Sequence, residues 1–184
     1  DKNGVLATDL KFIGDKNSIR LDPEMIFKPE IVEKMVDSTY IHNHPFNMPL
    51  SSNDIVQMAG FNIKKMLACT RNGGYSFLER TGTLTNEQHQ LFHNKAFKLL
   101  SKEISKIKQL SKTRGMTDIE RLNQLQDWRY QEFGKIAKEF NLRFENNIDR
   151  LTHLDDIPSG IFRINPFSRL IDNILVSCKN VTKS

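Results

Sequence analysis

The chain has 184 residues, of which 38% are hydrophobic and 27% are charged, and its formal net charge is +5. This composition is typical of a folded globular protein and excludes a disordered or low-complexity chain. No run approaches the roughly 18 apolar residues of a membrane span, and the polar N-terminal 20 residues do not resemble a signal peptide. Two cysteines are too few for a disulfide scaffold. We therefore expect reduced thiols, a cytoplasmic location and no membrane partner.

Residues 1–84 predict short strands and short helices in alternation. Residues 5–12 and 18–21 are short extended runs bounded by turn residues, which favours two short strands. A helix is expected to begin at Pro29, because proline is favoured in the first helical turn. Residues 38–42 predict the next strand, which leads into a loop that contains two prolines.

A further helix and a β-hairpin are predicted after that loop. The helix is expected from Ser52 to about Phe61. Two strands, over 66–70 and 75–79, flank an Asn-Gly-Gly sequence at 72–74, which favours a tight turn. This part of the chain therefore predicts an α/β fold.

Residues 85–148 predict a helical hairpin. Thr85 and Thr117 each precede a Gln or Glu by three residues, which is the spacing of a helix capping box. Apolar residues then recur at helical intervals, and Gly115 lies where a helix stop is expected. The expected helices span residues 86–112 and 118–148. The remaining residues, 149–184, end in an apolar patch over 170–176, so we expect a tail that packs back on the core.

Almost all of the net positive charge lies in the predicted hairpin, because residues 85–145 hold twelve basic and eight acidic side chains. A basic surface can bind a phosphate backbone, although a solvated helix face is the more common explanation. Trp128, Arg129 and Tyr130 combine aromatic and basic side chains, which could stack on nucleic acid. We favour a helix that buries both aromatic side chains, and we consider a nucleic-acid partner the less favoured possibility.

The segment with the most chemical information contains two histidines at the end of the strand predicted over 38–42. His42 and His44 are separated by one residue, so their side chains point the same way and can reach one metal ion. Asp54, ten residues after His44 and at the start of a helix, can supply a third ligand. Two histidines and one carboxylate leave the fourth position of a tetrahedral zinc site for water, as in catalytic zinc sites.

Ser51 precedes Asp54 by three residues and has two compatible interpretations. Its hydroxyl can point into the same cleft and stabilise an oxyanion, which would make Ser51 a catalytic residue. The Ser-x-x-Asp spacing also matches a helix capping pair.

Together, His-Asn-His-Pro at 42–45 and Ser-Ser-Asn-Asp at 51–54 resemble the signature of the JAB/MPN (JAMM) zinc metalloproteases, in the wording common in bacterial and phage members. The resemblance extends over about residues 1–84. It implies an α/β fold in which helices flank a mixed sheet, with the helical hairpin appended. It also implies a Zn²⁺ ion with three ligands: His42, His44 and Asp54. Ser51 would help to hold the tetrahedral intermediate.

The resemblance implies a metallopeptidase or isopeptidase that hydrolyses a bond in a flexible protein or peptide tail. Members of this family use a Glu on an early strand as general base, and alignment would place that Glu before Asp1. We therefore expect that the N-terminal strand is missing and that this chain binds zinc yet hydrolyses peptides poorly. Three glutamates, at 24, 30 and 33, follow the early strands and are less suited to this role. The alternative is a non-catalytic JAB/MPN-like binding or assembly module whose basic hairpin contacts a protein or nucleic-acid partner.

Overall fold

The computed structural model describes these residues: 12–14, 19–21, 28–44 and 47–152. Strand β1 (Phe12–Gly14) pairs antiparallel with β2 (Ile19–Leu21). The strand predicted over 18–21 is thus confirmed, whereas residues 1–11 and the apolar patch at 170–176 lie outside the described residues.

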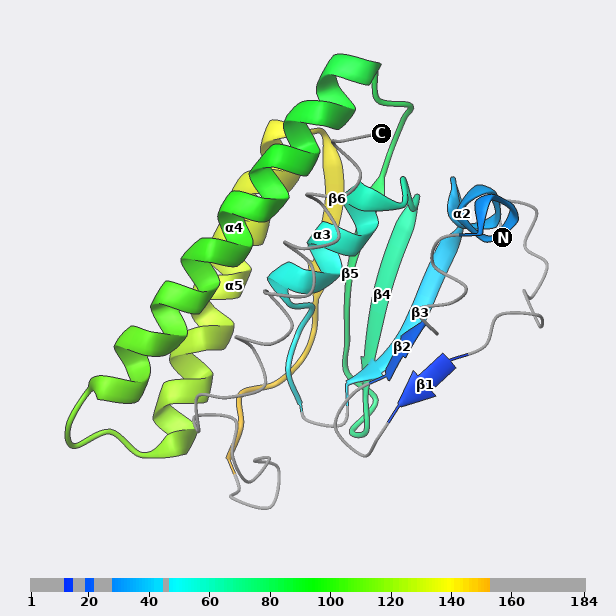
Figure 1. The fold of residues 1–184 in the computed structure, drawn as a ribbon. Coiled ribbons are helices and arrows are strands. Elements are labelled where there is room, and N and C mark those ends of the chain that lie inside the picture. Colours follow the sequence, from blue (N-terminus) through cyan, green and yellow to red (C-terminus); the bar gives the residue numbers. More distant parts are fainter. Residues whose placement is uncertain (1–11, 15–18, 22–27, 45–46, 153–184) are drawn as a thin grey trace.

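A four-stranded mixed sheet forms the centre of the molecule (Figure 1), with the strand order β3-β4-β5-β6. Strands β3 (Thr39–His44) and β4 (Lys65–Thr70) are parallel. Strand β5 (Tyr75–Arg80) is antiparallel to β4, and β6 (Leu142–Asn146) is antiparallel to β5. The mixed α/β class expected from the sequence is confirmed.

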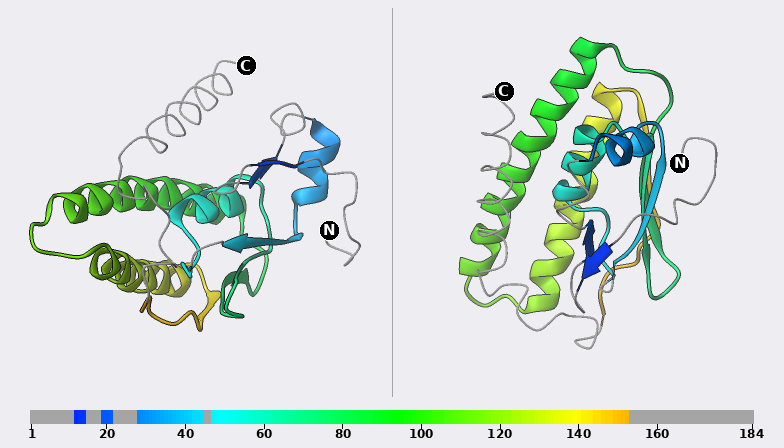
Figure 2. Two further views of the ribbon diagram at one scale, coloured as in Figure 1. Left: turned by 90° about the horizontal axis from the view of Figure 1, so that it is seen from below. Right: turned by 45° about the vertical axis from the view of Figure 1, so that its right-hand side comes forward.

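In the described part of the chain, helices accompany the four-stranded sheet. Helix α2 (Pro29–Met35) precedes β3, and α3 (Ser52–Gly60) connects the parallel strands β3 and β4. Helices α4 (Asn86–Lys112) and α5 (Asp118–Glu139) form an antiparallel hairpin between β5 and β6. Helices α3, α4 and α5 pack on the same face of the sheet (Figures 1 and 2). Within the described part of the chain, no helix combines the length and the apolar character that a membrane crossing requires.

Local sequence signals explain where the helices and turns lie. Helices α3, α4 and α5 each begin with the reciprocal hydrogen bonds of a capping box, which satisfies backbone N–H groups of the first turn. Gly115, between α4 and α5, has a φ of +78°, and Gly73, in the β4–β5 turn, has a φ of +81°. Both conformations favour glycine, because a Cβ atom is crowded at positive φ.

The second long helix ends earlier than predicted. The predicted range 118–148 is wrong at its end, because α5 stops at Glu139 and residues 142–146 form β6. Asn141 adopts a left-handed backbone conformation, with a φ of +51°, and thereby breaks the helix. Leu142 and Phe144 then alternate with charged residues, which is the period of a strand. The four-residue spacing of Phe140 and Phe144 imitates a helix and hides this change of period.

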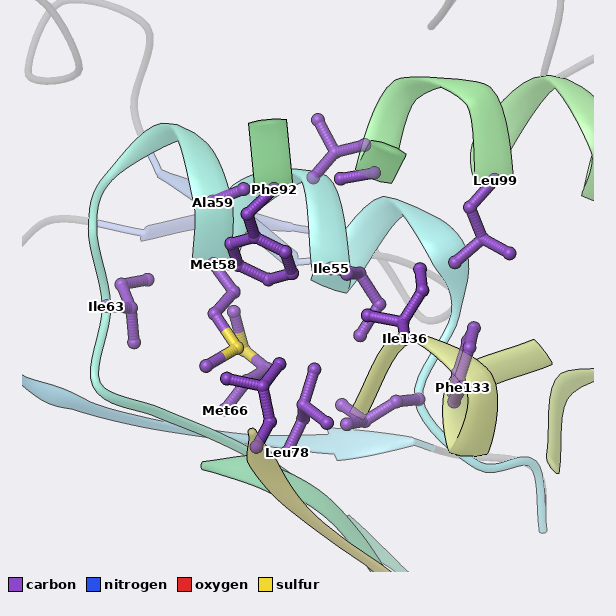
Figure 3. Packing of buried hydrophobic residues seen from close by; sticks show 14 of the residues in the cluster. Ile55, Met58, Ala59, Ile63, Met66, Leu78, Phe92, Leu99, Phe133 and Ile136 are labelled. Atoms are coloured by element: carbon purple, nitrogen blue, oxygen red, sulfur yellow. The ribbon is translucent and has the colours of Figure 1, made fainter. Parts of the chain in front are cut away.

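One hydrophobic core joins the sheet to the helical hairpin. Figure 3 shows Met58 of α3 between Phe92 of α4 and Met66 of β4. Buried residues of α5, among them Phe133, belong to the same cluster, as does Leu78 of β5. A second cluster lies farther along the hairpin and contains Met48, Leu110, Leu122, Leu125 and Leu151. The expected tail therefore begins against the hairpin at Leu151, while its residues from 153 onward lie outside the described range.

Candidate metal centre

Strand β3 presents its two histidines on the same face. Side chains along β3 alternate between exposed and partly buried, and both His42 and His44 are on the partly buried face. The strand pairs with β4 so that His42 lies opposite Ala68 and His44 lies opposite Thr70. The period of two in the strand therefore brings both imidazoles to one side, as the sequence predicts.

Asp54 reaches the histidines from the first turn of α3. It is the third residue of the helix, and its carboxylate completes the capping box with Ser51. The backbone N–H and the hydroxyl of Ser51 both donate to Oδ2 of Asp54, at 2.7 and 2.8 Å. Oδ1 makes neither of these hydrogen bonds and lies 3.3 Å from Nε2 of His42. The cap thus fixes Oδ2, which also lies near His44, and leaves Oδ1 beside His42.

The three side chains converge at spacings that suit a tetrahedral metal site. The Nε2 atoms of His42 and His44 are 2.9 Å apart, and Nε2 of His44 lies 3.5 Å from Oδ2 of Asp54. One possible ligand atom from each residue lies within 4.8 Å of the other two. With zinc–ligand bonds of about 2.0–2.1 Å at tetrahedral angles, two ligand atoms are about 3.3 Å apart. The observed separations therefore need only small adjustments to hold one ion.

The tautomer of His44 is set by a backbone carbonyl. Nδ1 of His44 lies 2.9 Å from the carbonyl oxygen of Met48, which can only accept a hydrogen bond. In neutral His44 the proton is therefore on Nδ1, and the lone pair of Nε2 faces His42 and Asp54. This is the arrangement in which a metal-ligating histidine is held by a carbonyl group. Nδ1 of His42 is buried without a hydrogen-bond partner in the described structure, whereas Nε2 of His42 lies close to His44 and Asp54.

The electrostatics of the cluster favour a cation. Burial raises the pKa of Asp54, but hydrogen bonds from His42 and His44 outweigh burial and hold this pKa well below its usual value. Burial lowers the pKa of His44, but the hydrogen bond and the charge of Asp54 outweigh burial, so the pKa of His44 is raised overall. The carboxylate is therefore ionised, and it attracts positive charge to the point where the two imidazoles meet.

The cluster is neither fully enclosed nor freely exposed. The side chains of His42, His44 and Asp54 are 14%, 18% and 10% exposed. A structural zinc site uses four protein ligands, whereas a catalytic site uses three and keeps one position open. Three ligands with partial exposure thus fit an ion that also coordinates water or a substrate atom.

The hydroxyl of Ser51 is occupied by the cap. It donates to Oδ2 of Asp54 and accepts from the backbone N–H of Asp54 at 3.3 Å. The capping interpretation of Ser51 is confirmed. To contact an oxyanion, this hydroxyl would have to turn its hydrogen away from Asp54, so the catalytic role of Ser51 stays a prediction.

Two charged residues behind the site were missed from the sequence. Glu103 of α4 and Arg129 of α5 are buried and form an ion pair, with Nη2 of Arg129 2.5 Å from Oε1 of Glu103. Their signal is positional, because each interrupts an apolar helical stripe: Glu103 follows Leu99 by four residues, and Arg129 lies midway between Leu125 and Phe133.

The surroundings of Arg129 also correct one sequence interpretation. The helix was expected to bury both aromatic neighbours of Arg129. Instead, Tyr130 is 57% exposed while Arg129 itself is buried, because the guanidinium finds an ionic partner inside the hairpin.

Comparison of the chain with models of protein families, with curated proteins and with solved structures gives no match in any of the three. The function must therefore be argued from the chemistry of the site itself.

Proposed function

We propose that the protein is a zinc-dependent metallopeptidase or isopeptidase of the JAB/MPN type that cuts a bond in a flexible peptide tail. The observation that carries this proposal is the convergence of His42, His44 and Asp54 at separations of 2.9 to 3.5 Å. The order of the elements adds support, because the histidine strand is followed by a loop and by the capped helix that supplies the carboxylate.

In this proposal, Nε2 of His42, Nε2 of His44 and Oδ1 of Asp54 hold the ion. A zinc ion bound there supplies a Lewis acid and lowers the pKa of a coordinated water to about 7. Met48 orients the ring of His44 through its carbonyl oxygen, and Ser51 orients the carboxylate of Asp54. The partial exposure of the three ligands leaves a side from which a peptide carbonyl can approach.

Metal analysis is the first test. The purified chain, loaded with Zn²⁺ and passed through a desalting column, should retain one zinc per chain. His44→Ala should abolish stoichiometric binding, because two remaining ligands bind zinc weakly. His93→Ala is the matched control, since His93 is a partly buried histidine on α4 outside the cluster. A wild-type chain that retains no zinc would overturn the proposal at its base.

Hydrolysis is the second test. We expect the zinc-loaded chain to cleave fluorogenic peptide or isopeptide substrates at a low rate, as the poorly placed glutamates suggest, and both chelation and Asp54→Asn should remove this activity. Zinc binding with no cleavage of any peptide or isopeptide substrate would contradict the enzymatic proposal.

One observation favours a second candidate, a zinc-stabilised binding or assembly module. Hydrolysis of this type uses a carboxylate base, yet Glu30 and Glu33 are exposed on α2, and Glu24 lies outside the described residues. Glu103 is buried but accepts hydrogen bonds from Ser52 and Arg129 through its two oxygens. Zinc binding without hydrolysis would support this second candidate.

A further inference from the structure

The loop that joins β3 to α3 is held by the helical hairpin. Of this loop, residues 47–51 are described, and they contain neither helix nor strand. The side-chain amide of Gln126 donates to the carbonyl oxygen of Asn47. The side chain of Met48 is buried in the cluster that contains Leu110 and Leu122, and Leu50 is fully buried in the main core. The backbone of the loop therefore takes its shape from α4 and α5.

Glu103 and Arg129 contact this loop and the start of α3 directly. Nη1 of Arg129 donates to the carbonyl oxygen of Pro49 at 3.2 Å. Oε2 of Glu103 accepts the backbone N–H of Ser52 at 2.8 Å, and the other oxygen, Oε1, accepts two hydrogen bonds from Arg129. Glu103 is 3% exposed and Arg129 is 6% exposed, so both charges are removed from water. Each charge is therefore stabilised by the other and by these backbone partners.

Along the loop, the residues held by the hairpin alternate with the residues that orient His44 and Asp54. Met48, whose carbonyl oxygen fixes the ring of His44, lies between Asn47 and Pro49. Ser51, whose backbone and hydroxyl fix Asp54, directly precedes Ser52. A shift of the loop would therefore displace the partners of two ligands together.

We propose that the buried Glu103–Arg129 pair is the positioning element of the metal centre and sets its zinc affinity through the loop at 47–52. The inference rests on the proposed metal-dependent function and adds a role for the hairpin in it. Outer partners of metal ligands commonly change metal affinity by 10–100-fold when they are replaced. No hydrogen bond or ion pair between either residue and His42, His44 or Asp54 is seen in the described structure, although the positive charge of Arg129 also acts on His44 directly. The hydrogen bonds that connect the pair to the site run through the loop.

The decisive variant is the double substitution Glu103→Met with Arg129→Met. Replacing a buried ion pair by apolar residues of similar size is often neutral for stability, so the fold can persist while the loop loses both contacts. Zn²⁺ affinity, measured by competition with a chromophoric chelator, should fall by about 10–100-fold. At saturating Co²⁺, the visible absorption of the bound ion should also change, because its ligand geometry changes.

Arg80→Met is the matched control. Arg80 is equally buried, donates to the backbone carbonyls of Asn62 and Ile63, and pairs with Asp37. It is the last residue of β5 and lies beside the start of β4, whereas the residue that pairs with His44 is at the end of β4. Its replacement should lower thermal stability and leave both the Zn²⁺ affinity and the Co²⁺ spectrum at their wild-type values.

The outcomes distinguish the positioning role from the proposed function. A wild-type chain that binds no Zn²⁺ would overturn both the positioning role and the proposed function. A wild-type chain that binds Zn²⁺, with a double variant of equal affinity and spectrum, overturns the positioning role and leaves the metal site intact. If the double variant does not fold, Arg129→Lys and Glu103→Gln decide in its place. Lysine cannot reproduce the fork of the guanidinium, so weaker Zn²⁺ binding and a shifted Co²⁺ spectrum are expected there, and wild-type values would overturn the proposal.

Discussion

The two carboxylate oxygens of Asp54 differ in their contacts, because Ser51 donates two hydrogen bonds to Oδ2 while Oδ1 lies near His42. Ser51→Ala removes the N-cap of α3, which should cost about 1 kcal/mol of unfolding free energy. It also frees Oδ2 of Asp54 from the hydroxyl, so Zn²⁺ binding should weaken as well. Thr85→Ala removes the equivalent cap of α4 and should cost a similar amount with unchanged Zn²⁺ affinity. Equal Zn²⁺ affinity in both variants, measured by chelator competition, would contradict the orienting role of Ser51.

His44 and Asp54 also predict how the stability of the metal-free protein depends on pH. The pKa of His44 is raised in the folded state, so its contribution is complete below the unfolded pKa of about 6.5 and is lost as pH rises through the folded pKa. The pKa of Asp54 is depressed, so its contribution is present above the unfolded value of about 3.9 and is lost as pH falls through the folded pKa.

The metal-free protein should therefore have a higher Tm near pH 6 than near pH 8.5. Zn²⁺ should stabilise the protein most at the higher pH, where protons no longer compete for the imidazoles. Thermal unfolding with and without chelator checks both trends. His44→Asn should reduce the difference in Tm between the two pH values, and an undiminished difference would show that another group is responsible.

At the scale of the elements, replacing two glycines by alanine should change the stability in opposite directions. Gly115 has a positive φ between α4 and α5, and Gly134 lies inside α5, with open space around each. Gly115→Ala should destabilise the protein by about 1–2 kcal/mol through backbone strain alone. Gly134→Ala should stabilise it by up to about 1 kcal/mol, because alanine is the better helix former. Denaturant unfolding measures both, and the same sign in both variants would contradict this account of the turn.

Elements with strong local signals could be predicted from the sequence. Helix α4 matches its predicted range of 86–112, and the β4–β5 hairpin follows from its glycine turn. Strand β6 was missed because the four-residue spacing of Phe140 and Phe144 hides its short alternation, and because its partner β5 is far away in the sequence. The convergence of His42, His44 and Asp54 was predicted from their spacing. Glu103 and Arg129 only interrupt apolar stripes in the sequence, and their tertiary contacts with the loop could not be predicted from that signal.

At the scale of the whole molecule, the three proposed metal ligands connect two elements of the main core. His42 and His44 belong to β3 and Asp54 belongs to α3, so unfolding of either element disrupts the site. A ligand that binds only the folded state adds about 2.7 kcal/mol at 100 times its Kd. Zn²⁺ should therefore raise the Tm of the entire cooperative transition, and chelator should reverse the shift. A chain with both histidines replaced by alanine should show no shift with Zn²⁺.

The insertion of the hairpin between neighbouring strands has a consequence for folding order. Arg80 pairs with Leu142 across 61 intervening residues, so β6 reaches β5 only after a long loop has closed. Helices α4 and α5 form through local contacts and bring the two ends of that segment together, where Thr81 donates to the carbonyl oxygen of Asn141. Prior folding of the hairpin shortens the effective loop and lowers the entropic cost of closure by roughly 1–2 kcal/mol. We therefore expect β6 to join the sheet only after the hairpin has formed, and amides of β6 to exchange whenever the hairpin opens.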